Sequence, residues 1–348
     1  MELDTLPSNG NAPADAVRVA DNWNSRYTSA RMWPMIRRAK WIEGIAPEAP
    51  VSEVAGRALR VRLEPVAHYL PLAAKRSDKD VEYVHQVRVA SRRAVAAIKL
   101  FQPLLPARRS RRLRRKLNRI RRACGDARDF DVLIERLSSS PVEDDVGREA
   151  LVGRIKQCRD AAQVPIRKVR KRLPERRLAR RIKQLVARVR WRADTSVCPE
   201  PCFGAYARVE LRRQLDRFFG FATGDLTQDE PLHRFRIEAK RFRYHLELLA
   251  GAFSTPFREQ LYPAIEELQE RLGQVMDCAT ASDRYRSWAE QWAGTAEAAF
   301  LSAWAASEEA ELRTSRAAFL DWWNTERAEA LRASFAELLT SAGANGCG

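Results

Sequence analysis

The sequence predicts an all-α protein made of two similar helical halves. Three observations predict this fold class. First, apolar residues recur at helical spacing along almost the whole chain of 348 residues. Second, the composition is dominated by Leu, Ala, Arg and Glu, and strand-like alternation is scarce. Third, Pro and Gly stand between the periodic segments. With 45% hydrophobic residues the chain can bury a core, and its length suits about two domains or one large one.

This spacing places the helical segments in order. In the first half, helices are expected near residues 52–74, 80–102, 108–124, 145–172 and 176–192. In the second half they are expected near residues 203–221, 231–251, 258–272, 276–293 and 296–340, the last one broken. The predicted organisation is an N-terminal tail and lead-in segment over residues 1–50, a first repeat over 51–195 and a second repeat over 196–343.

The two halves match each other at a fixed offset of 148 residues. The pairs that align are His85 with His233, Arg88 with Arg236, Arg92 with Lys240, Arg93 with Arg241, Leu117 with Ile265, Gly125 with Gly273 and Asp129 with Asp277. An ungapped register across three helices indicates an internal duplication. We therefore expect two four-helix-bundle-like repeats related by a pseudo-two-fold axis.

Positive charge is concentrated in the first half. The chain has 62 Lys and Arg against 45 Asp and Glu, a formal net charge of +17. Residues 108–122 hold ten cations and no acid, and residues 167–192 hold thirteen cations and one acid, whereas from Ser287 to the end there are four cations and nine acids. This excess indicates a polyanionic partner, whether nucleic acid, an anionic membrane face or a phosphate polymer.

Several classes of protein are not favoured. No apolar run approaches the ~18 residues that cross a bilayer, and the first residues lack a signal-peptide pattern, so no membrane partner is expected. Six cysteines in a chain of this length do not make a disulfide framework, and the lone pair Cys198 and Cys202 predicts no metal site. We expect a cytoplasmic protein, or a nuclear one if the source cell has a nucleus.

One helix of the first half separates a cationic face from an apolar one. On a helical wheel, His85, Arg88, Arg92 and Lys99 form a stripe with Arg93 at its flank, and the opposite side carries Val87, Ala90, Ala94, Ile98 and Phe101. Like charges at i and i+4 repel each other. The stripe is therefore tolerable only if an anion compensates it or an acidic neighbour packs against it.

The corresponding helix of the second half repeats this pattern. Its polar face carries His233, Arg236, Lys240 and Arg241, and is extended by Tyr244 and Glu247. The guanidinium group of arginine binds two phosphate oxygens at once, and histidine adds an N–H donor. Two histidines at the same repeat position favour a binding role for both, whereas His68 and His245 have no such match and are predicted to be structural.

The third helix of the first half, residues 108–122, is basic all round except for an apolar stripe. Some of its cations must face the same groove as the stripe headed by His85, and others must face water. The corresponding helix of the second half, residues 258–270, is acidic, so the first half is expected to bind a polyanion more strongly. The carboxylates that follow the basic helix are expected to cap the next helix: Asp126, Asp129 and Asp131.

These motifs resemble the CHAD (conserved histidine α-helical) domain. The resemblance rests on His85-x-x-Arg88-Val89-x-x-Arg92-Arg93, on His233-x-x-Arg236-Ile237-x-x-Lys240-Arg241, and on the turn Gly125-x-x-Arg128-Asp129-x-Asp131-Val132. It covers about residues 50–340. The second copy of the turn keeps Gly273 and Asp277 but has no arginine, which departs from the family pattern.

The resemblance implies a basic channel between the two repeats, binding of inorganic polyphosphate without catalysis, and localisation to polyphosphate granules. The implied polyphosphate-binding residues are His85, Arg88, Arg92, Arg93, Lys116, Arg119, Arg122, His233, Arg236, Lys240 and Arg241. No catalytic residue, cofactor or metal is predicted. A bare phosphate chain needs cations in a row and no aromatic platforms, and the first cationic stripe contains no aromatic residue.

Three other hypotheses remain open. The first alternative is an RNA- or DNA-binding protein that uses the same basic half, since any such surface binds a nucleic-acid backbone non-specifically. The second is an enzyme acting on polyphosphate or triphosphate, for which the only candidate string is Glu309-x-Glu311-x-Arg313, in a helical stretch. The third is an acidic-lipid or protein-docking scaffold that uses the C-terminal tryptophans, although such residues more often close a core or a dimer interface.

Overall fold

The computed structural model describes residues 40–138, 145–193 and 198–344. The chain divides into two compact units, residues 1–40 and 41–348, and the account that follows concerns the second. Most of the predicted N-terminal tail, and part of the predicted junction between the repeats, lie outside the described residues. Within the described ranges the regular elements are all helices, so the all-α prediction is confirmed.

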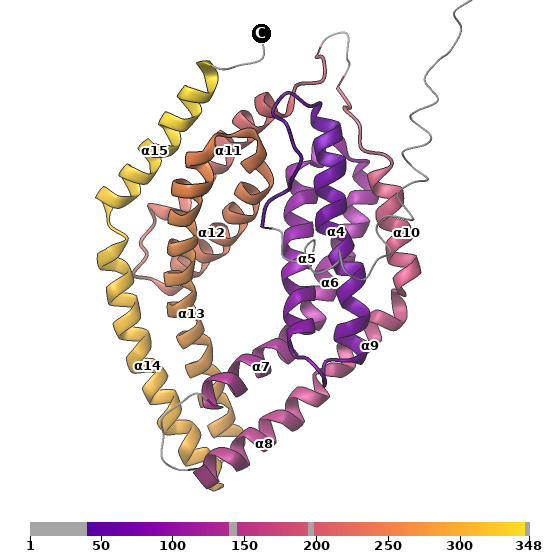
Figure 1. The fold of residues 1–348 in the computed structure, drawn as a ribbon. Coiled ribbons are helices and arrows are strands. Elements are labelled where there is room, and N and C mark those ends of the chain that lie inside the picture. The colour runs from indigo at the N-terminus through magenta and orange to yellow at the C-terminus, as the bar shows by residue number, and fades with distance from the viewer. Residues whose placement is uncertain (1–39, 139–144, 194–197, 345–348) are drawn as a thin grey trace, which may run out of the picture. The chain divides into compact units, whose positions relative to one another are not determined.

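The first half is a group of helices that pack side by side (Figure 1). It consists of α4 (Val51–Lys75), α5 (Glu82–Leu100), the short 3₁₀ helix η1 (Gln102–Leu104), α6 (Ala107–Ala123), α9 (Gln163–Arg172) and α10 (Glu175–Val186). Pro50, Pro106 and Pro174 stand immediately before three of these helices, where a residue without an N–H group costs no helical hydrogen bond. Their apolar faces meet in one core with Leu63 and Leu117 fully buried.

The second half contains α11 (Phe203–Ala222), α12 (Asp229–Leu249), the 3₁₀ helix η2 (Ala250–Ala252), the π-helical turn η3 (Phe257–Leu261), α13 (Tyr262–Gln291), α14 (Ala296–Trp322) and α15 (Thr325–Ala344). Aromatic rings fill its core. Phe218 of α11 lies between Phe235 and Phe242 of α12, at centroid distances of 5.5 and 4.7 Å. Phe335 of α15 closes the core against Phe242 at 5.7 Å.

Two helices of the first half, α7 (Gly125–Ser138) and α8 (Asp145–Ala161), extend toward α13 and α14 (Figure 1). The four helices share a second core that includes Leu137, Ile155 and Leu301. Trp288 stacks on Phe130 and on Trp292 with nearly parallel rings at 5.6 Å in both cases, and the Arg154 guanidinium lies 3.8 Å from the Trp292 ring centroid. These tryptophans close a core between the two halves.

Several predicted boundaries are wrong. Residues 258–272 and 276–293 are not separate helices, because α13 continues through Gly273 without a break. The helix expected over 145–172 divides near Ala162 into α8 and α9. The segment expected as a turn with capping carboxylates is itself helix α7, so Asp129 and Asp131 lie beyond its first turn and do not cap it. The expected break in the last segment occurs between α14 and α15.

The two halves are joined at several points. Segments before α4 and α11 form an antiparallel bridge between Pro50 and Cys202, with Phe203 N donating to Ala49 O at 2.8 Å. The Tyr206 hydroxyl of α11 donates to the Leu100 carbonyl at the end of α5, at 2.6 Å. Helices α5 and α12 pack against each other, and this contact positions the cationic stripes.

Two further properties concern the described residues. None of their helices is long and apolar enough to span a membrane. No group of three or more His, Cys, Asp or Glu side chains within the described ranges has the arrangement of a metal site.

Candidate polyanion-binding site

Helices α5 and α12 present their cationic faces where the two halves meet. The apolar sides of both helices are buried as predicted, with Val87 and Ala94 in α5 and Phe235 and Phe242 in α12 essentially inaccessible. This burial fixes the rotation of each helix about its axis, and the cations on the other side stay partly exposed. We refer to His85, Arg88, Arg92, Arg236 and Lys240, which these two helices contribute, as the α5–α12 site.

Each helix holds one arginine in an ion pair with an aspartate of the following segment. Arg88 lies 3.9 Å from Asp129 of α7, and Arg236 lies 3.1 Å from Asp277 of α13. The residue numbers of the two arginines differ by 148, and so do those of the two aspartates. Both aspartates are partly exposed, at 40% and 55% of the side chain, so each holds its arginine at the edge of the site and leaves donors free for an anion.

Gly125 makes room for Arg88. It is the first residue of α7, and a Cβ atom at this position would lie 3.3 Å from the Arg88 Nη1 atom. The same guanidinium nitrogen donates to the Arg121 carbonyl at 3.5 Å. The end of α6 and the start of α7 therefore shape the space that Arg88 occupies.

Positive charge is crowded around Arg92. Burial is the main cause that lowers the pKa of Arg88 and of Arg236, and the charge of Arg92 lowers both further. Burial together with Arg236 and Arg92 lowers the pKa of Lys240 to about 7. Burial, then the neighbouring Arg128, lowers the pKa of His85. An anion bound among these groups would stabilise their protonated forms.

A second group of cations lies farther along the same two helices. The pKa of Lys99 in α5 is lowered by burial and then by Arg241 of α12, with smaller effects of Arg114 and Arg217. Glu238 partly compensates this group, since its carboxylate contacts Arg217 at 2.8 Å and Arg241 at 3.5 Å. Arg241 therefore lies with Lys99 and away from the crowded charges around Arg92.

Arg93 forms an ion pair with Glu247 in the interface between the two halves. Its Nε atom lies 2.8 Å from a Glu247 carboxylate oxygen, and its Nη2 donates to the other oxygen at 3.0 Å. Glu247 is fully buried and also contacts Arg62 at 3.3 Å and Arg243 at 3.4 Å. Tyr244 and Glu247, predicted to extend the polar face of α12, are therefore buried in this junction.

The predicted cations of α6 do not share one face. The side chain of Lys116 is crowded by Arg181 and Arg177 of α10 and by Arg119, which places it on the flank of α6 that faces α10. The charge of Arg92 instead acts on Arg121, whose pKa is lowered mainly by burial. Arg122 is exposed next to Arg121. The structure thus brings Arg121 to the α5–α12 site, and Lys116 to the opposite flank.

The remaining histidines differ in their environments. His233 is partly buried near the start of α12. His245 is buried, its Nδ1 lies 2.8 Å from the Gln214 side-chain oxygen, and burial lowers its pKa to about 3. A neutral, hydrogen-bonded histidine of this kind fits the structural role predicted for it.

The predicted binding residues did not include Arg121, Arg128 and Lys99, although the helical wheel had placed Lys99 on the cationic stripe. Lys99 shares the helical stripe of His85, and Arg128 belongs to the turn motif, so both signals were present in the sequence. A wheel of residues 107–123 also separates Arg121 from Lys116 by about 140°. What the wheel does not give is which flank faces α5 and which faces α10.

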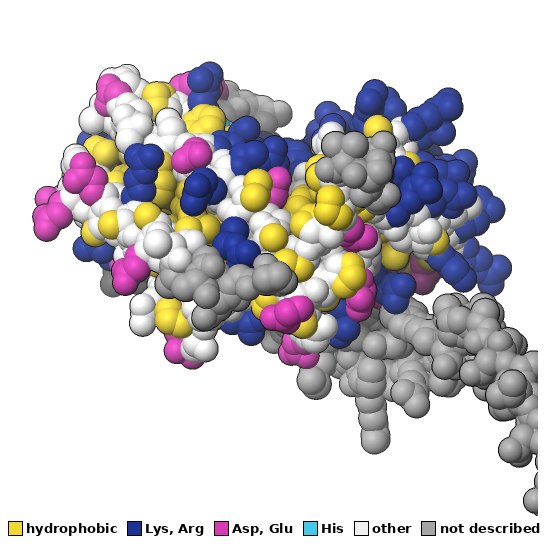
Figure 2. Space-filling model, turned by 90° about the horizontal axis from the view of Figure 1, so that it is seen from above, with side chains coloured by type: hydrophobic (Ala, Val, Ile, Leu, Met, Phe, Trp, Pro, Cys, Tyr) yellow, Lys and Arg dark blue, Asp and Glu magenta, His cyan; other side chains and the backbone are white. Residues whose placement is uncertain are grey.

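Figure 2 shows the resulting charge distribution on one face of the molecule. Lys and Arg side chains crowd the side formed by the first half, whereas on the side formed by the second half they are fewer and are interspersed with Asp and Glu. This agrees with the two basic runs at residues 108–122 and 167–192.

A family model for the CHAD domain matches residues 57–286. The chain belongs to the CHAD family. Its fold is similar to that of the CHAD domain from the plant Ricinus communis, with 25% sequence identity and a TM-score of 0.61 over 80% of this chain and 95% of that chain. It is also similar in fold to PptA from Streptomyces chartreusis, with 17% identity and a TM-score of 0.58 over 79% of this chain and 99% of that chain. No match was found among curated proteins.

In this CHAD protein the motif that identifies the family is also the motif that builds the site. The matched region contains α5, α6, α7 and α12 whole and ends within α13, just beyond Asp277. Five of the helical positions that carry the family resemblance therefore meet at the α5–α12 site, whereas Arg93 and Arg241 lie elsewhere in the interface between the halves.

Proposed function

We propose that this chain binds inorganic polyphosphate at the α5–α12 site and does not act on it catalytically. The observation that carries the proposal is the crowding of Arg88, Arg92, Arg236 and Lys240 from two different halves, which adds to burial in lowering the pKa values of Arg88, Arg236 and Lys240. A linear chain with about one negative charge per phosphate relieves this repulsion along its length. Membership of the CHAD family supports the same function.

We further propose that the halves arose by duplication and are related by a pseudo-two-fold axis. Two observations support this. The ion pairs of Arg88 with Asp129 and of Arg236 with Asp277 occupy matching positions. The contacts between the halves are also reciprocal, because Arg93 meets Glu247 while Lys99 interacts with Arg241, the counterparts of these two residues in the opposite repeat. Reciprocity of this kind is expected of a two-fold interface.

A basic channel between the halves suits a bare phosphate chain better than nucleic acid. Sites for single-stranded nucleic acid combine cations with aromatic platforms for the bases. Tyr244, which interacts electrostatically with Arg121, is buried at 6% exposure and offers no open ring face to a base. The alternative, RNA or DNA bound through its backbone, is the competing outcome of the test below.

An enzymatic role is not part of the proposal. Glu309 and Glu311 lie on α14, and Glu309 pairs at the surface with Arg286 and Arg313 at 3.1 and 3.6 Å. A helical pair of this kind is typical of a solvated surface. We propose a cytoplasmic location at polyphosphate granules, consistent with the ligand.

Titration calorimetry tests the function. Long-chain polyphosphate and an RNA of equal charge are titrated at two salt concentrations into wild-type protein, into Arg88→Ala with Arg92→Ala, and into Arg176→Ala with Arg180→Ala. The last variant removes two exposed cations of α10 and matches the change in charge. We expect a strong preference for polyphosphate and at least a tenfold loss of affinity in the first variant alone. Equal binding of both ligands with the same salt dependence would favour nucleic acid.

A further inference from the structure

A second cationic surface lies on the opposite flank of α6. The buried apolar stripe of α6 consists of Leu113, Leu117 and Ile120. The cations on its two sides therefore point toward different neighbouring helices. Arg114 and Arg121 interact with groups of α5 and α12. The cations of the other flank face α10, where Lys116 is crowded by Arg177 and Arg181.

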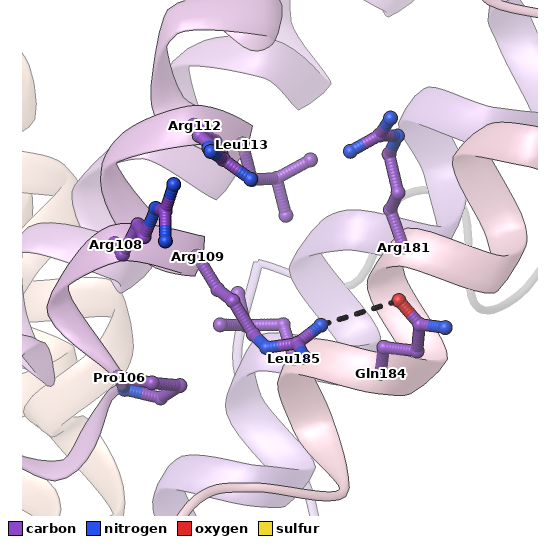
Figure 3. Close-up of a pocket in the computed structure, with 8 residues that line it drawn as sticks. All are labelled: Pro106, Arg108, Arg109, Arg112, Leu113, Arg181, Gln184 and Leu185. Carbon is purple, nitrogen blue, oxygen red and sulfur yellow. Dashed lines mark hydrogen bonds between the residues drawn. The ribbon is translucent and has the colours of Figure 1, made fainter.

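This flank contains a pocket between α6 and α10, with a volume of about 290 Å³. Arg108, Arg109 and Arg112 of α6 and Arg181 of α10 line it, and Leu113 and Leu185 contribute apolar walls (Figure 3). Arg112 and Arg181 lie on opposite sides of the space, and Arg109 donates to the Gln184 side-chain oxygen at 3.4 Å. Two helices thus contribute arginines to the lining of one pocket that is open to solvent.

Among the described residues, no acidic side chain neutralises the charges of this pocket. Its lining contains no acidic side chain, and within the described part of the chain no ion pair joins its four arginines to Asp or Glu. The Nε atom of Arg181 is buried and has no hydrogen-bond partner among the described residues. Four uncompensated guanidinium groups around one volume are the arrangement that binds a compact polyanion.

The pocket continues past the end of α10. A neighbouring pocket of about 390 Å³ shares Pro106 and Arg109 with the first and is lined by Arg188, Arg190 and Arg192. This segment is fixed beside η1, because Arg190 N donates to the Leu104 carbonyl at 3.2 Å. The Arg188 and Arg192 side chains each donate to a backbone carbonyl of the same segment, which holds them in place.

We propose that the pocket between α6 and α10 is a second anion site, which binds two or three linked phosphates of an inorganic phosphate chain. Forked guanidinium donors from two helices match the several oxygens of such a group. The lining of both pockets holds no aromatic side chain, so nothing there would recognise a nucleobase. This site is separate from the α5–α12 site, and the proposal for it does not depend on the proposed function.

Tripolyphosphate titration into the full chain tests the proposal, at about 0.15 M salt to screen diffuse charge. The variant Arg109→Gln, Arg112→Gln, Arg181→Gln is compared with Arg115→Gln, Arg176→Gln, Arg180→Gln. The second set removes three exposed cations from the same two helices outside the pocket lining. We expect the first variant to bind one tripolyphosphate fewer than wild-type protein, and the second to bind the same number. Unchanged stoichiometry and affinity in the first variant, or equal losses in both, would overturn the proposal.

Two further measurements distinguish this site from the α5–α12 site and from a nucleotide-binding site. Arg92→Gln with Lys240→Gln is expected to retain the second site, and its loss there would show that both measurements report a single site. ATP carries the same triphosphate on a nucleoside, and we expect it to bind no more tightly than tripolyphosphate. Binding of ATP that is tenfold tighter would overturn the assignment to an inorganic chain. Thermal unfolding of each variant checks that it is folded.

Discussion

Arg93 of α5 and Glu247 of α12 form an ion pair at 2.8 Å that joins the two halves of the chain. The Glu247 carboxylate is fully buried and is shared with Arg62 and Arg243. Burial lowers the pKa of Arg62 to about 10, although Glu247 opposes this effect. One buried acid is therefore shared by three arginines, of which Arg243 also contacts Glu266 at 3.4 Å. Arg93 lies in the junction between α5 and α12, whereas the sequence alone had suggested a ligand contact for it.

Replacement of Glu247 by Gln is expected to destabilise the protein strongly. The substitution leaves three arginines without their shared anion, and breaking a buried pair in this way typically costs about 3–5 kcal/mol. The free energy of unfolding, measured by urea denaturation, gives the effect. Asp283→Asn is the control, since the exposed pair of Asp283 with Arg286 is expected to contribute less than about 1 kcal/mol. A loss in Glu247→Gln no larger than in the control would contradict a central role for this carboxylate.

Polyphosphate affinity is expected to fall as the pH rises through neutrality. Burial lowers the pKa of Lys240 to about 7, together with the positive charges of Arg236, Arg92 and Arg243. The carboxylate of Asp277 acts in the opposite direction. Below this pH the lysine is charged and ready to bind, whereas above it a proton must be taken up with the ligand. The affinity therefore decreases by up to about tenfold per pH unit until the pKa of the bound state is passed.

Calorimetry at pH 6, 7 and 8.5 measures this dependence. Burial and then the charge of Arg128 lower the pKa of His85, so any proton that this histidine takes up on binding adds to the same slope. Lys240→Arg keeps a permanent charge and is expected to flatten the profile, whereas Lys183→Arg at an exposed position of α10 leaves it unchanged. A profile as steep in Lys240→Arg as in wild-type protein would assign the titration to another group.

Two glycines at matching positions are expected to respond differently to alanine. A Cβ atom at Gly125 would lie 3.3 Å from Arg88, so Gly125→Ala displaces this guanidinium and weakens polyphosphate binding severalfold. A Cβ atom at Gly273, in the interior of α13, meets nothing within 4 Å. Gly273→Ala is therefore expected to stabilise the protein by about 0.5–1 kcal/mol and to leave affinity unchanged. Equal affinity of both variants would show that Arg88 is not positioned by this contact.

Removal of the two aspartates that hold Arg88 and Arg236 is expected to tighten polyphosphate binding. Asp129→Asn with Asp277→Asn releases both guanidinium groups and adds two units of positive charge to the site. We expect a severalfold gain in affinity at low salt and a smaller gain at high salt. Asp78→Asn with Asp283→Asn makes the same change in charge at exposed positions outside the site. A loss of affinity in the first variant would mean that the aspartates orient the arginines for binding.

The helical content and the buried faces were predictable because they depend on local spacing. The apolar stripe of residues 84–101 predicted which side of α5 is buried, since a helix with a period of 3.6 residues can bury only one face at once. Boundaries were less predictable. Gly273 reads as a break in the sequence, yet α13 continues through it because Leu272 and Val275 on either side are buried in the core. Segment 125–138 reads as a turn, yet it folds as α7 because Leu133 and Leu137 pack in the second core.

The sequence by itself determined the all-α class, the family and the two cationic stripes, because these follow from residue types at fixed spacing along one helix. Only the tertiary structure decided which cations have acidic partners and which do not. A helical wheel gives directions about one axis, whereas Arg93 meets Glu247 across 154 residues of chain. Likewise Lys116 and Arg121 belong to one basic helix, but the packing of α5 on one flank and α10 on the other sends their charges to two different surfaces.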